Sequence, residues 1–482
     1  MKELAAIAID AAQSAGASFV DFRFVEERVN RVVVERRSLR EVSETEESGY
    51  CIRILLDGAW GFAFSTQLNK DSVLQTARRA IAIAHASGYV PKPVVVEFAR
   101  EAAHIDTRLG KCLKDPFEID NNEKAEYLLT VCDLMLQVPG IAMTRGVFWF
   151  TKIRRVVANS DGSYLDLTNW FSNPMLQATA VINGEAQERN YTGGARQAGY
   201  EFISEIDLIG NAKRLAEEAV LKAKADECPH GVMDLVLDPH HLALTMHESV
   251  GHPTELDRIL GWEANMAGRS FVKPEDIGSL RYGNELINFT VDNTLEGGLG
   301  SWFYDDDGVE MKRFPLIQKG ILVNVTTTRE TAPLVGLERS NGCCRAQSYY
   351  NFPINRQANC YMEPGLDDDV TLADLLAGVD CGIYIEGRGS FSIDQMRNNF
   401  QFGGDMFWMI ENGKLTKPLK KVTYQAQTRE FWSSCDAIAG KAFWKPFGIW
   451  NCGKGEPSQR MIMTHGASPC RFRNIKVGEA RS

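Results

Sequence analysis

Hydrophobic positions in the first half of the chain follow two different periods. Apolar residues three and four apart predict helices, whereas short apolar runs rich in β-branched and aromatic residues predict strands. The helical spacing occurs near residues 2–15, 69–87, 122–137 and 205–225. The strand-like segments between them read FVDFRFV, RVVVER, GYCIRILL and WGFAFS, then MTRGVFWF, IRRVVANS, SYLDLTN and ATAVING. The order helix, strands, helix therefore occurs twice, which predicts an internal duplication.

The character of the chain changes after the helix expected at 205–225. The segment KADECPH ends that helix, and the half that follows is mostly β-like, with a short helix expected near 371–378. Residues 88–120 are interpreted as a connector within the first half. We therefore predict an α+β protein of two domains with antiparallel sheets. Residues 1–226 would form a helix-and-sheet domain, and residues 227–482 a β-rich domain.

A short strand–helix unit at the start of the second half carries most of the chemistry. Residues 233–237 are interpreted as a buried strand, and Asp238-Pro239 as a helix N-cap followed by proline at the first helical position. An apolar stripe then recurs every four residues, at Leu242, Met246 and Val250. His247 and Glu248 lie off this stripe, so we expect the pair to face a cleft.

The predicted helix carries the pattern His-Glu-x-x-x-His, from His247 to His252. Imidazole nitrogens can hold a metal ion, and Glu248 can take a proton from water, which is the set that zinc hydrolases use. The five-residue separation puts the imidazoles roughly 140° apart on an ideal α-helix. A local π-type turn would realign them, and so would a helix that ends at Gly251. The alternative is an exposed helix end with solvated histidines.

A zinc site of this type needs a third protein ligand. Glu255 and Asp257 lie just past the second histidine, and Cys452 lies in the late segment IWNCGKGEPSQ. A thiolate binds zinc well, but an isolated cysteine is more often a small buried apolar residue. The residues alone leave the third ligand open.

Composition and charge narrow the class of protein. A hydrophobic content of 44% and a charged content of 24% are typical of a globular chain. The net charge of −10 argues against general nucleic-acid binding, and no apolar run reaches the roughly 18 residues of a membrane span. The eleven cysteines lack paired spacing, so we expect reduced thiols and a cytoplasmic location. The acidic runs 305–307 and 367–369 are interpreted as solvated loop acids rather than a cation site.

Several segments, which follow one another along the chain at family-like intervals, resemble the TldD/PmbA family of zinc peptidases, specifically its catalytic TldD branch. HESVGH matches the HExxxH element of that branch, and NCGKGEPSQ matches a late CGK-type segment. Further matches are TVDNTLEGGLGSWFYDDDGVEMKRFPLIQKGIL, CCRAQSYYNFPINR, CGIYIEGRGS and FQFGGDMFWMIENGKLTKPLK. The N-terminal half matches more loosely. Two positions depart from the family pattern, because Pro253 stands where glycine is usual and Cys344 alters the GR-x-x-SY element.

The resemblance implies roles for particular residues. It implies a Zn²⁺-binding set of His247, His252 and Cys452. It implies that Glu248 is the general base of a peptidase that acts on unfolded or extended peptides. We add Arg345 and Tyr349, from CRAQSY, as candidate donors to the oxyanion and the substrate. A structural salt bridge is the competing role for Arg345.

Partners and alternatives also follow from the resemblance. Chains of this type commonly pair with a PmbA/TldE-type chain around an enclosed chamber, so we expect such a partner or a homodimer, with the N-terminal domain contributing to it. The main alternative is a non-catalytic binding or scaffold subunit, like the family's inactive branch, which lacks HExxxH. A cysteine hydrolase using Cys452 with His465 is a weaker alternative, because no orienting carboxylate is evident nearby.

Overall fold

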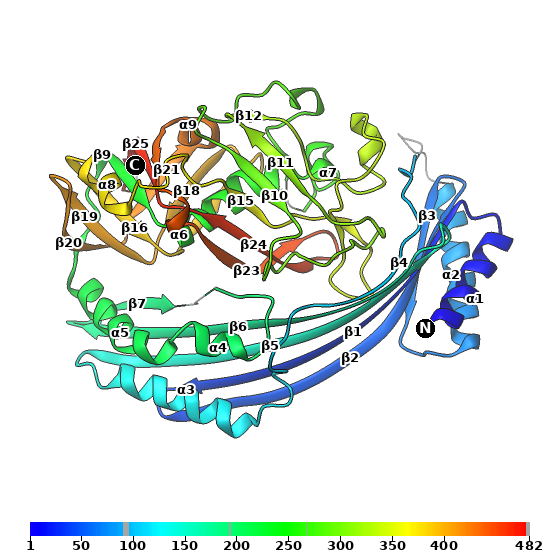
Figure 1. Cartoon of the computed structure of the whole chain (residues 1–482), viewed down its shortest axis with the longest axis horizontal. Helices are drawn as coiled ribbons and strands as arrows, with labels where there is room; N and C mark the ends of the chain where they lie inside the picture. The colour runs from blue at the N-terminus through cyan, green and yellow to red at the C-terminus, as the bar shows by residue number, and fades with distance from the viewer. Residues whose placement is uncertain (90–95, 192–193, 267, 479–482) are drawn as a thin grey trace.

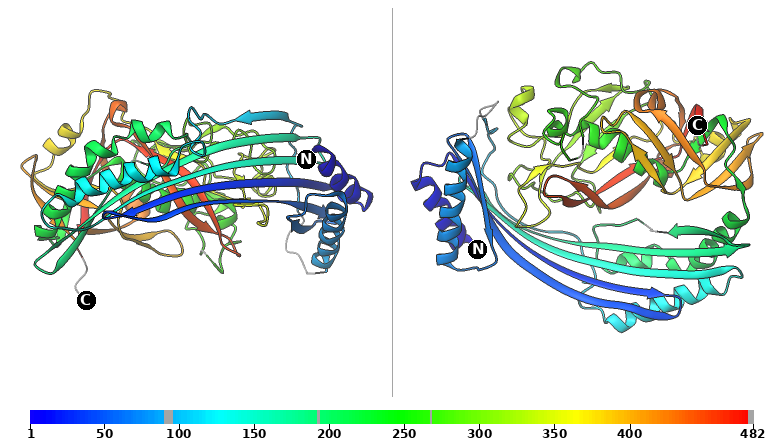
Figure 2. Two further views of the ribbon diagram at one scale, coloured as in Figure 1. Left: turned by 90° about the horizontal axis from the view of Figure 1, so that it is seen from below. Right: turned by 180° about the vertical axis from the view of Figure 1, so that it is seen from behind.

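The computed structural model describes residues 1–89, 96–191, 194–266 and 268–478, which form two bodies. The N-terminal half is a long curved sheet with helices near both ends. The C-terminal half is a β-rich body that lies against the concave side of this sheet (Figures 1 and 2). The prediction of an α+β fold is confirmed, and most strand pairs are antiparallel as predicted, although each of the three larger sheets also contains parallel pairing.

Seven strands build the N-terminal sheet, and five helices accompany it in the described residues. The strands are β1 (Phe19–Glu35), β2 (Ser38–Leu56), β3 (Ala59–Ser65), β4 (Ile105–Leu109), β5 (Ile141–Asn159), β6 (Tyr164–Ile182) and β7 (Glu185–Tyr191). The helices are α1 (Lys2–Ser14), α2 (Lys70–Gly88), α3 (Asn121–Leu136), α4 (Glu201–Glu205) and α5 (Leu208–Lys224). The sheet order is β3-β2-β1-β5-β6-β4, with β7 also paired to β6. The order helix, strands and helix thus occurs twice, as the sequence predicts, with two long strands and one seven-residue strand in each pass.

The connector predicted at 88–120 contains one strand of the sheet. β4 pairs with β6 in parallel, whereas the other pairings of this sheet are antiparallel. Residues 90–95 of the connector lie outside the described part of the chain. The strand was missed because its five residues are mostly exposed and show no apolar run.

The strands of this sheet are longer than the sequence predicts. FVDFRFV and RVVVER belong to one strand, β1, so the prediction of separate strands is wrong here. The polar residues Glu26 to Arg28 stay within the ladder because β1 pairs with β2 on one side and with β5 on the other. Backbone hydrogen bonds to both neighbours therefore continue the strand through a polar stretch.

Two larger sheets and a short strand pair make up the C-terminal half. The first sheet contains β8 (Asp226–Glu227), β9 (Gly231–Leu237), β16 (Cys381–Glu386), β17 (Phe391–Ile393), β18 (Asn399–Gly403), β19 (Met406–Glu411), β20 (Lys414–Lys420), β21 (Thr423–Gln427), β22 (Cys435–Ile438) and β25 (Cys470–Val477). The second sheet contains β10 (Phe289–Asp292), β11 (Arg313–Gln318), β12 (Ile321–Leu322), β15 (Cys360–Met362), β23 (Lys445–Lys454) and β24 (Gln459–Ala467). The separate pair is β13 (Cys344–Arg345) and β14 (Ile354–Asn355). The α-helices are α6 (Pro239–Met246), α7 (Leu256–Ile259), α8 (Leu372–Ala377) and α9 (Thr428–Ser433).

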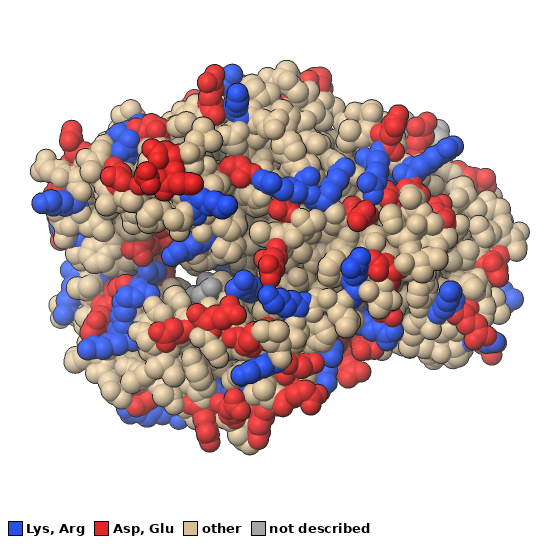
Figure 3. Space-filling model, in the orientation of Figure 1, with Lys and Arg blue, Asp and Glu red and all other residues tan. Residues whose placement is uncertain are grey.

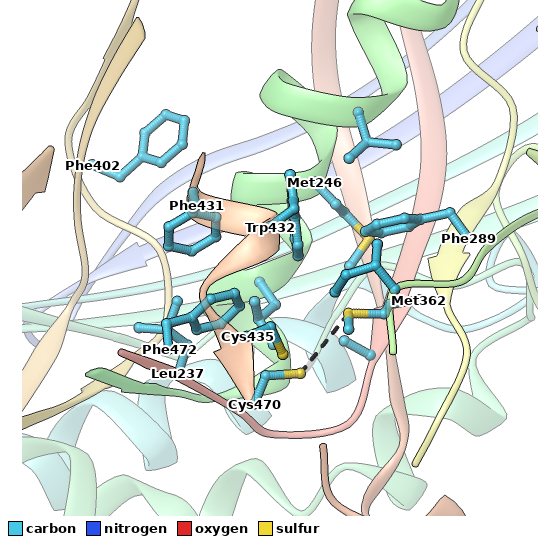
Figure 4. Close-up of a cluster of buried hydrophobic side chains, with 14 of the residues drawn as sticks. Leu237, Met246, Phe289, Met362, Phe402, Phe431, Trp432, Cys435, Cys470 and Phe472 are labelled. Carbon is cyan, nitrogen blue, oxygen red and sulfur yellow. Dashed lines mark hydrogen bonds between the residues drawn. The ribbon is translucent and has the colours of Figure 1, made fainter. Parts of the chain in front are cut away.

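The main hydrophobic core joins these two sheets to α6. Met246 on α6 packs among side chains of both sheets (Figure 4). Those side chains include Leu237 and Phe472 of the first sheet and Phe289 and Met362 of the second. Leu242 and Val250 are also fully buried, so the predicted apolar stripe is confirmed. This packing fixes the helix that carries the histidine pattern.

The acidic run 305–307 is buried between the two halves. Its exposed fractions are 0%, 1% and 1%, so its interpretation as solvated loop acids is wrong. The run pairs with three arginines of the N-terminal sheet: Asp306 with Arg23 (3.2 Å) and Arg155 (3.0 Å), and Asp307 with Arg53 (2.7 Å). These buried ion pairs tie the C-terminal half to the curved sheet. The second acidic run, 367–369, is exposed as predicted.

The domain boundary at 226/227 stays a prediction. α5 ends at Lys224, and β8 at 226–227 already pairs with β20 of the second half. On the face drawn in Figure 3, acidic and basic side chains intermingle without a dominant sign. Among the described residues, no helix is both long and apolar enough to cross a membrane.

Candidate metal centre

A π-type turn brings the two histidines of the pattern together. Asp238 caps α6 through the His241 N–H, and the helix continues into a π-helical turn at His247–Gly251. In such a turn each residue lies over the fifth residue before it, so the two imidazole rings meet with centroids 4.8 Å apart. Gly251 and His252 keep helical backbone angles, so the helix does not end at Gly251. The first of the two predicted geometries is the one observed.

Gln357 stabilises this unusual turn. Its side-chain amide donates to the His247 carbonyl at 3.1 Å, a carbonyl that the π-type turn displaces from the regular helical ladder. A Cβ at Gly251 would lie only 2.0 Å from the Gln357 Oε1 atom. Glycine is therefore required at this position for the glutamine to reach the turn.

Cys452 completes a cluster of three donors. It lies on β23, directly after a bulge in the pairing of β23 with β24. One donor atom each from His247, His252 and Cys452 can be chosen so that all three lie within 4.8 Å of one another. Each residue is 4% exposed. The alternative of an exposed helix end with solvated histidines is therefore wrong.

A hydrogen-bond relay orients the first imidazole. The His465 Nδ1 atom lies 2.8 Å from the Cys360 carbonyl oxygen, which can only accept, so Nδ1 carries the proton. The pKa of His465 is well below its usual value, chiefly because of burial, so its Nε2 atom carries no proton. The His247 Nδ1 atom, 2.8 Å away, must then donate to it. His247 consequently keeps a free lone pair on Nε2, the atom available to a metal.

A carboxylate orients the second imidazole. The His252 Nδ1 atom lies 2.8 Å from the Glu255 Oε2 atom, and the His252 Nε2 atom lies 3.5 Å from the Cys452 sulfur. Glu255 also binds Lys454 at 3.3 Å, and Asp257 binds the same ammonium at 2.7 Å. The sequence left both acids open as the third metal ligand. In the structure both of them already bind a cationic side chain of the protein. A carboxylate behind a ligating histidine is a common arrangement at metal sites.

The protonation states of the cluster suit a metal ion. Burial lowers the pKa of His247 to about 4 and also lowers the pKa of His252, so both imidazoles are neutral at neutral pH. Burial alone would raise the pKa of the Cys452 thiol, but nearby positive charge, first that of Arg356, outweighs it and lowers that pKa. Two neutral imidazoles and a favoured thiolate form a donor set that fits a transition-metal ion.

Glu248 lies beside this cluster, and Arg397 pairs with it. The carboxylate is 5% exposed, and its Oε2 atom accepts from the Arg397 guanidinium. Arg397 lies in the hairpin between β17 and β18 with φ at 63°, a backbone conformation that few non-glycine residues adopt. Sequence reasoning missed Arg397 because a loop arginine gives no periodic or motif signal. The only available clue was that a buried glutamate needs a cation.

The two residues predicted to bind substrate, Arg345 and Tyr349, are both buried in contacts within the protein. Arg345 is 2% exposed and donates to the backbone carbonyls of Gln357 (3.3 Å) and Ile462 (2.8 Å). Tyr349 is 6% exposed, and its ring lies 6.2 Å from the Phe64 ring. Their substrate roles stay predictions. Cys452 and His465, paired in the cysteine-hydrolase alternative, contact different histidines of the pattern: Cys452 contacts His252, and His465 contacts His247.

We expect His465→Leu to weaken metal binding by about 10- to 100-fold, because His247 would lose the partner that fixes its tautomer. A competitive chelator titration would measure this loss. His104→Leu, which removes a histidine of the N-terminal half, is the control and should leave the affinity unchanged. Equal affinities in all three proteins would show that the relay does not orient the donor.

Two neutral imidazoles, a thiolate and an adjacent buried carboxylate on an α+β scaffold define the class of metal-dependent hydrolases. The chain belongs to the PmbA/TldD family of metallopeptidases. The model of the PmbA/TldA metallopeptidase C-terminal domain matches residues 230–478, and the model of domain 1 matches residues 20–84.

Similar proteins span nearly the whole chain. A metalloprotease of Methanothermobacter thermautotrophicus is 27% identical over 95% of each chain, and a zinc metalloprotease TldD homolog of Saccharolobus solfataricus is 24% identical over 98% of each. Two solved structures share the fold. A Thermotoga maritima protein proposed to modulate a DNA gyrase has a TM-score of 0.79 at 16% identity, covering 99% of this chain and 100% of its own. TldE of Thermococcus kodakarensis has a TM-score of 0.76 at 15% identity, with the same coverage.

Proposed function

We propose that the protein is a zinc-dependent peptidase of the catalytic, TldD-like branch, acting on unfolded or extended peptides. One observation carries the proposal: His247, His252 and Cys452 converge in metal-ready protonation states directly beside Glu248. The imidazole–thiolate set suits zinc, which is borderline soft and accepts nitrogen and sulfur ligands. The name of the S. solfataricus relative supports the same ion.

Each residue has a definite task in this proposal. His247, His252 and Cys452 would hold the ion, which when bound supplies a Lewis acid and makes water more acidic. Glu248 would accept the proton of the attacking water on Oε1, because Oε2 is held by Arg397. The same carboxyl group would then deliver this proton to the leaving amine. Arg397 keeps the carboxylate in place while it does so.

The edge of the first C-terminal sheet offers a place for the substrate backbone. β17 is the terminal strand of the sheet order among the described residues, and its residues are exposed or half-buried. The hairpin that follows β17 carries Arg397, the partner of Glu248. An extended peptide that adds to β17 would therefore pass close to the general base. Backbone pairing of this kind gives affinity with loose sequence preference.

A partner chain completes the proposal. We propose a PmbA/TldE-like subunit or a second copy of this chain, with residues 1–226 contributing to a chamber around the site. The family membership supports this arrangement, and the likeness to TldE supports the fold alone. Restricted access would explain a preference for unfolded chains.

The proposed activity can be tested with one substrate protein, offered in an unfolded and in a folded form. A reduced, carboxymethylated substrate protein should be cleaved, whereas its folded form should survive. A chelator should stop cleavage, and added zinc should restore it. If the protein retains zinc but cleaves no peptide, alone or with a partner subunit, the peptidase proposal is wrong and the protein is better explained as a non-catalytic scaffold subunit.

A further inference from the structure

β4 is an unprotected edge of the N-terminal sheet. It is the terminal strand of the sheet order, and within the described residues it pairs with β6 alone. Edge strands of natural proteins are usually protected by lysine, proline, a bulge or a covering element, because a row of unpaired backbone groups can pair with another strand. The β4 sequence IDTRL contains neither lysine nor proline, and its pairing with β6 has no register shift.

The pairing with β6 determines which backbone groups of β4 point outward. His104 accepts a hydrogen bond from β6 at 2.8 Å, and Gly110 donates one to β6 at 2.7 Å. Even-numbered residues therefore turn their backbone groups toward β6, whereas Ile105, Thr107 and Leu109 turn theirs away. Of these outward groups, only the Thr107 N–H has a hydrogen-bond partner within the described residues, the carboxylate of the preceding aspartate at 2.8 Å.

One face of β4 is apolar and exposed. Ile105 is 77% exposed and Leu109 is 67% exposed, and the two share a face because side chains alternate along a strand. Leu113, just past the strand, is 71% exposed. A cavity of about 450 Å³, lined in part by Leu109, Leu113 and Phe303, borders this end of β4. Exposed apolar side chains beside unpaired backbone groups indicate a surface that another chain covers.

The five residues of β4 are complementary to themselves when two copies run antiparallel. With Thr107 opposite its own counterpart, Ile105 faces Leu109 of the second copy, and Asp106 faces Arg108. Apolar pairs and pairs of opposite charge across two strands are both stabilising. Asp106 and Arg108 already form an ion pair at 2.8 Å within the chain, and the second copy would place the same two charges, in reverse order, beside it. A register shifted by two residues would instead set like charges opposite each other.

We propose that β4 is the edge through which two copies of this chain pair, as antiparallel strands related by a twofold axis. Each Thr107 would donate its N–H to the Thr107 carbonyl of the second copy, in exchange for the contact with Asp106. The cavity beside Leu109 would then receive the segment of the second copy that precedes β4. The choice of a second copy builds on the assembly in the proposed function, whereas the pairing rests on β4 alone.

Sedimentation velocity of the full-length, zinc-loaded protein tests the pairing. The wild type should sediment with about twice the chain mass of 53.8 kDa. Thr107→Pro removes an outward N–H but no hydrogen bond to β6, so it should weaken the dimer by about tenfold or more while the sheet persists. Thr107→Val keeps this N–H and is the matched control, so it should dimerise like the wild type.

Charge exchange tests the register and guards against misfolding of the proline variant. Asp106→Arg and Arg108→Asp each set like charges opposite each other in a homodimer, so each alone should associate more weakly by about tenfold. Mixed in equal amounts, the two variants should form a mixed dimer, because both cross-strand charge pairs are then opposite in sign. Glu217→Arg, which changes an exposed acid on α5, is the control and should dimerise like the wild type.

Three results would overturn the proposal. They are a monomeric wild type, a dimer that Thr107→Pro leaves as tight as the wild type, and a mixture of the charge variants that associates no better than its components. Sedimentation requires no peptide cleavage. A dimer that depends on β4 but cleaves no peptide would therefore contradict the peptidase proposal and leave this interface standing.

Discussion

Replacing Glu248 with glutamine is expected to lower kcat by about 10²- to 10⁴-fold while the protein keeps its metal, because the amide cannot accept the proton of water. Glutamine preserves the size of the side chain and an oxygen that can still accept from Arg397. The loss should therefore appear in kcat rather than in folding. Steady-state cleavage of an unfolded substrate, measured beside metal content, would show both results.

Glu363→Gln is the matched control for this experiment. Glu363 also pairs with an arginine, Arg313, at 2.8 Å, but it lies outside the donor cluster. This variant should retain wild-type kcat. If Glu248→Gln stayed within a few-fold of the wild type, another group would have to act as the base.

Replacing Asp306 with asparagine is expected to lower the free energy of unfolding by about 3–5 kcal/mol. The change leaves Arg23 and Arg155 buried without their shared counter-charge, because these guanidiniums lie 3.2 and 3.0 Å from Asp306. The hydrogen bond from the Ala346 N–H at 2.7 Å can persist to the amide oxygen. Urea unfolding of the full chain would measure the difference.

The second acidic run supplies the control for this prediction. Asp369→Asn changes an exposed aspartate in a similar sequence context and should alter stability by less than about 0.5 kcal/mol. If both variants lost the same stability, the buried ion pairs would not be what joins the two halves. A large loss confined to Asp306→Asn supports that role.

Local sequence signals predicted the metal-bearing helix well. The Asp238-Pro239 start, the apolar stripe and the π-type turn each depend on neighbouring residues, and each is observed. The residues alone left Cys452 as one of three open candidates for the third ligand, and the family resemblance, rather than spacing, favoured it. The structure brings it to the two histidines by means of a strand some 200 residues further along the chain.

Local sequence patterns could not predict which charged or polar side chains from distant parts of the chain would pair with one another. Arg397 and His465 join the site from separate strands or loops, and neither has a periodic signature. The interpretation of Asp306 failed for the same reason, because its arginines come from the N-terminal sheet. β1 was divided wrongly because hydrogen bonding to two neighbouring strands, rather than side-chain pattern, decides its length.

Metal content is the most direct test of the account. Mass spectrometry should be applied to the wild type, His247→Ala and Cys452→Ala, each purified without chelators. We expect about one zinc ion per chain in the wild type and a loss of it in both variants, because each removes one of three protein ligands. Zinc retained by Cys452→Ala would contradict the ligand set, and a metal-free wild type would contradict the metallopeptidase mechanism itself.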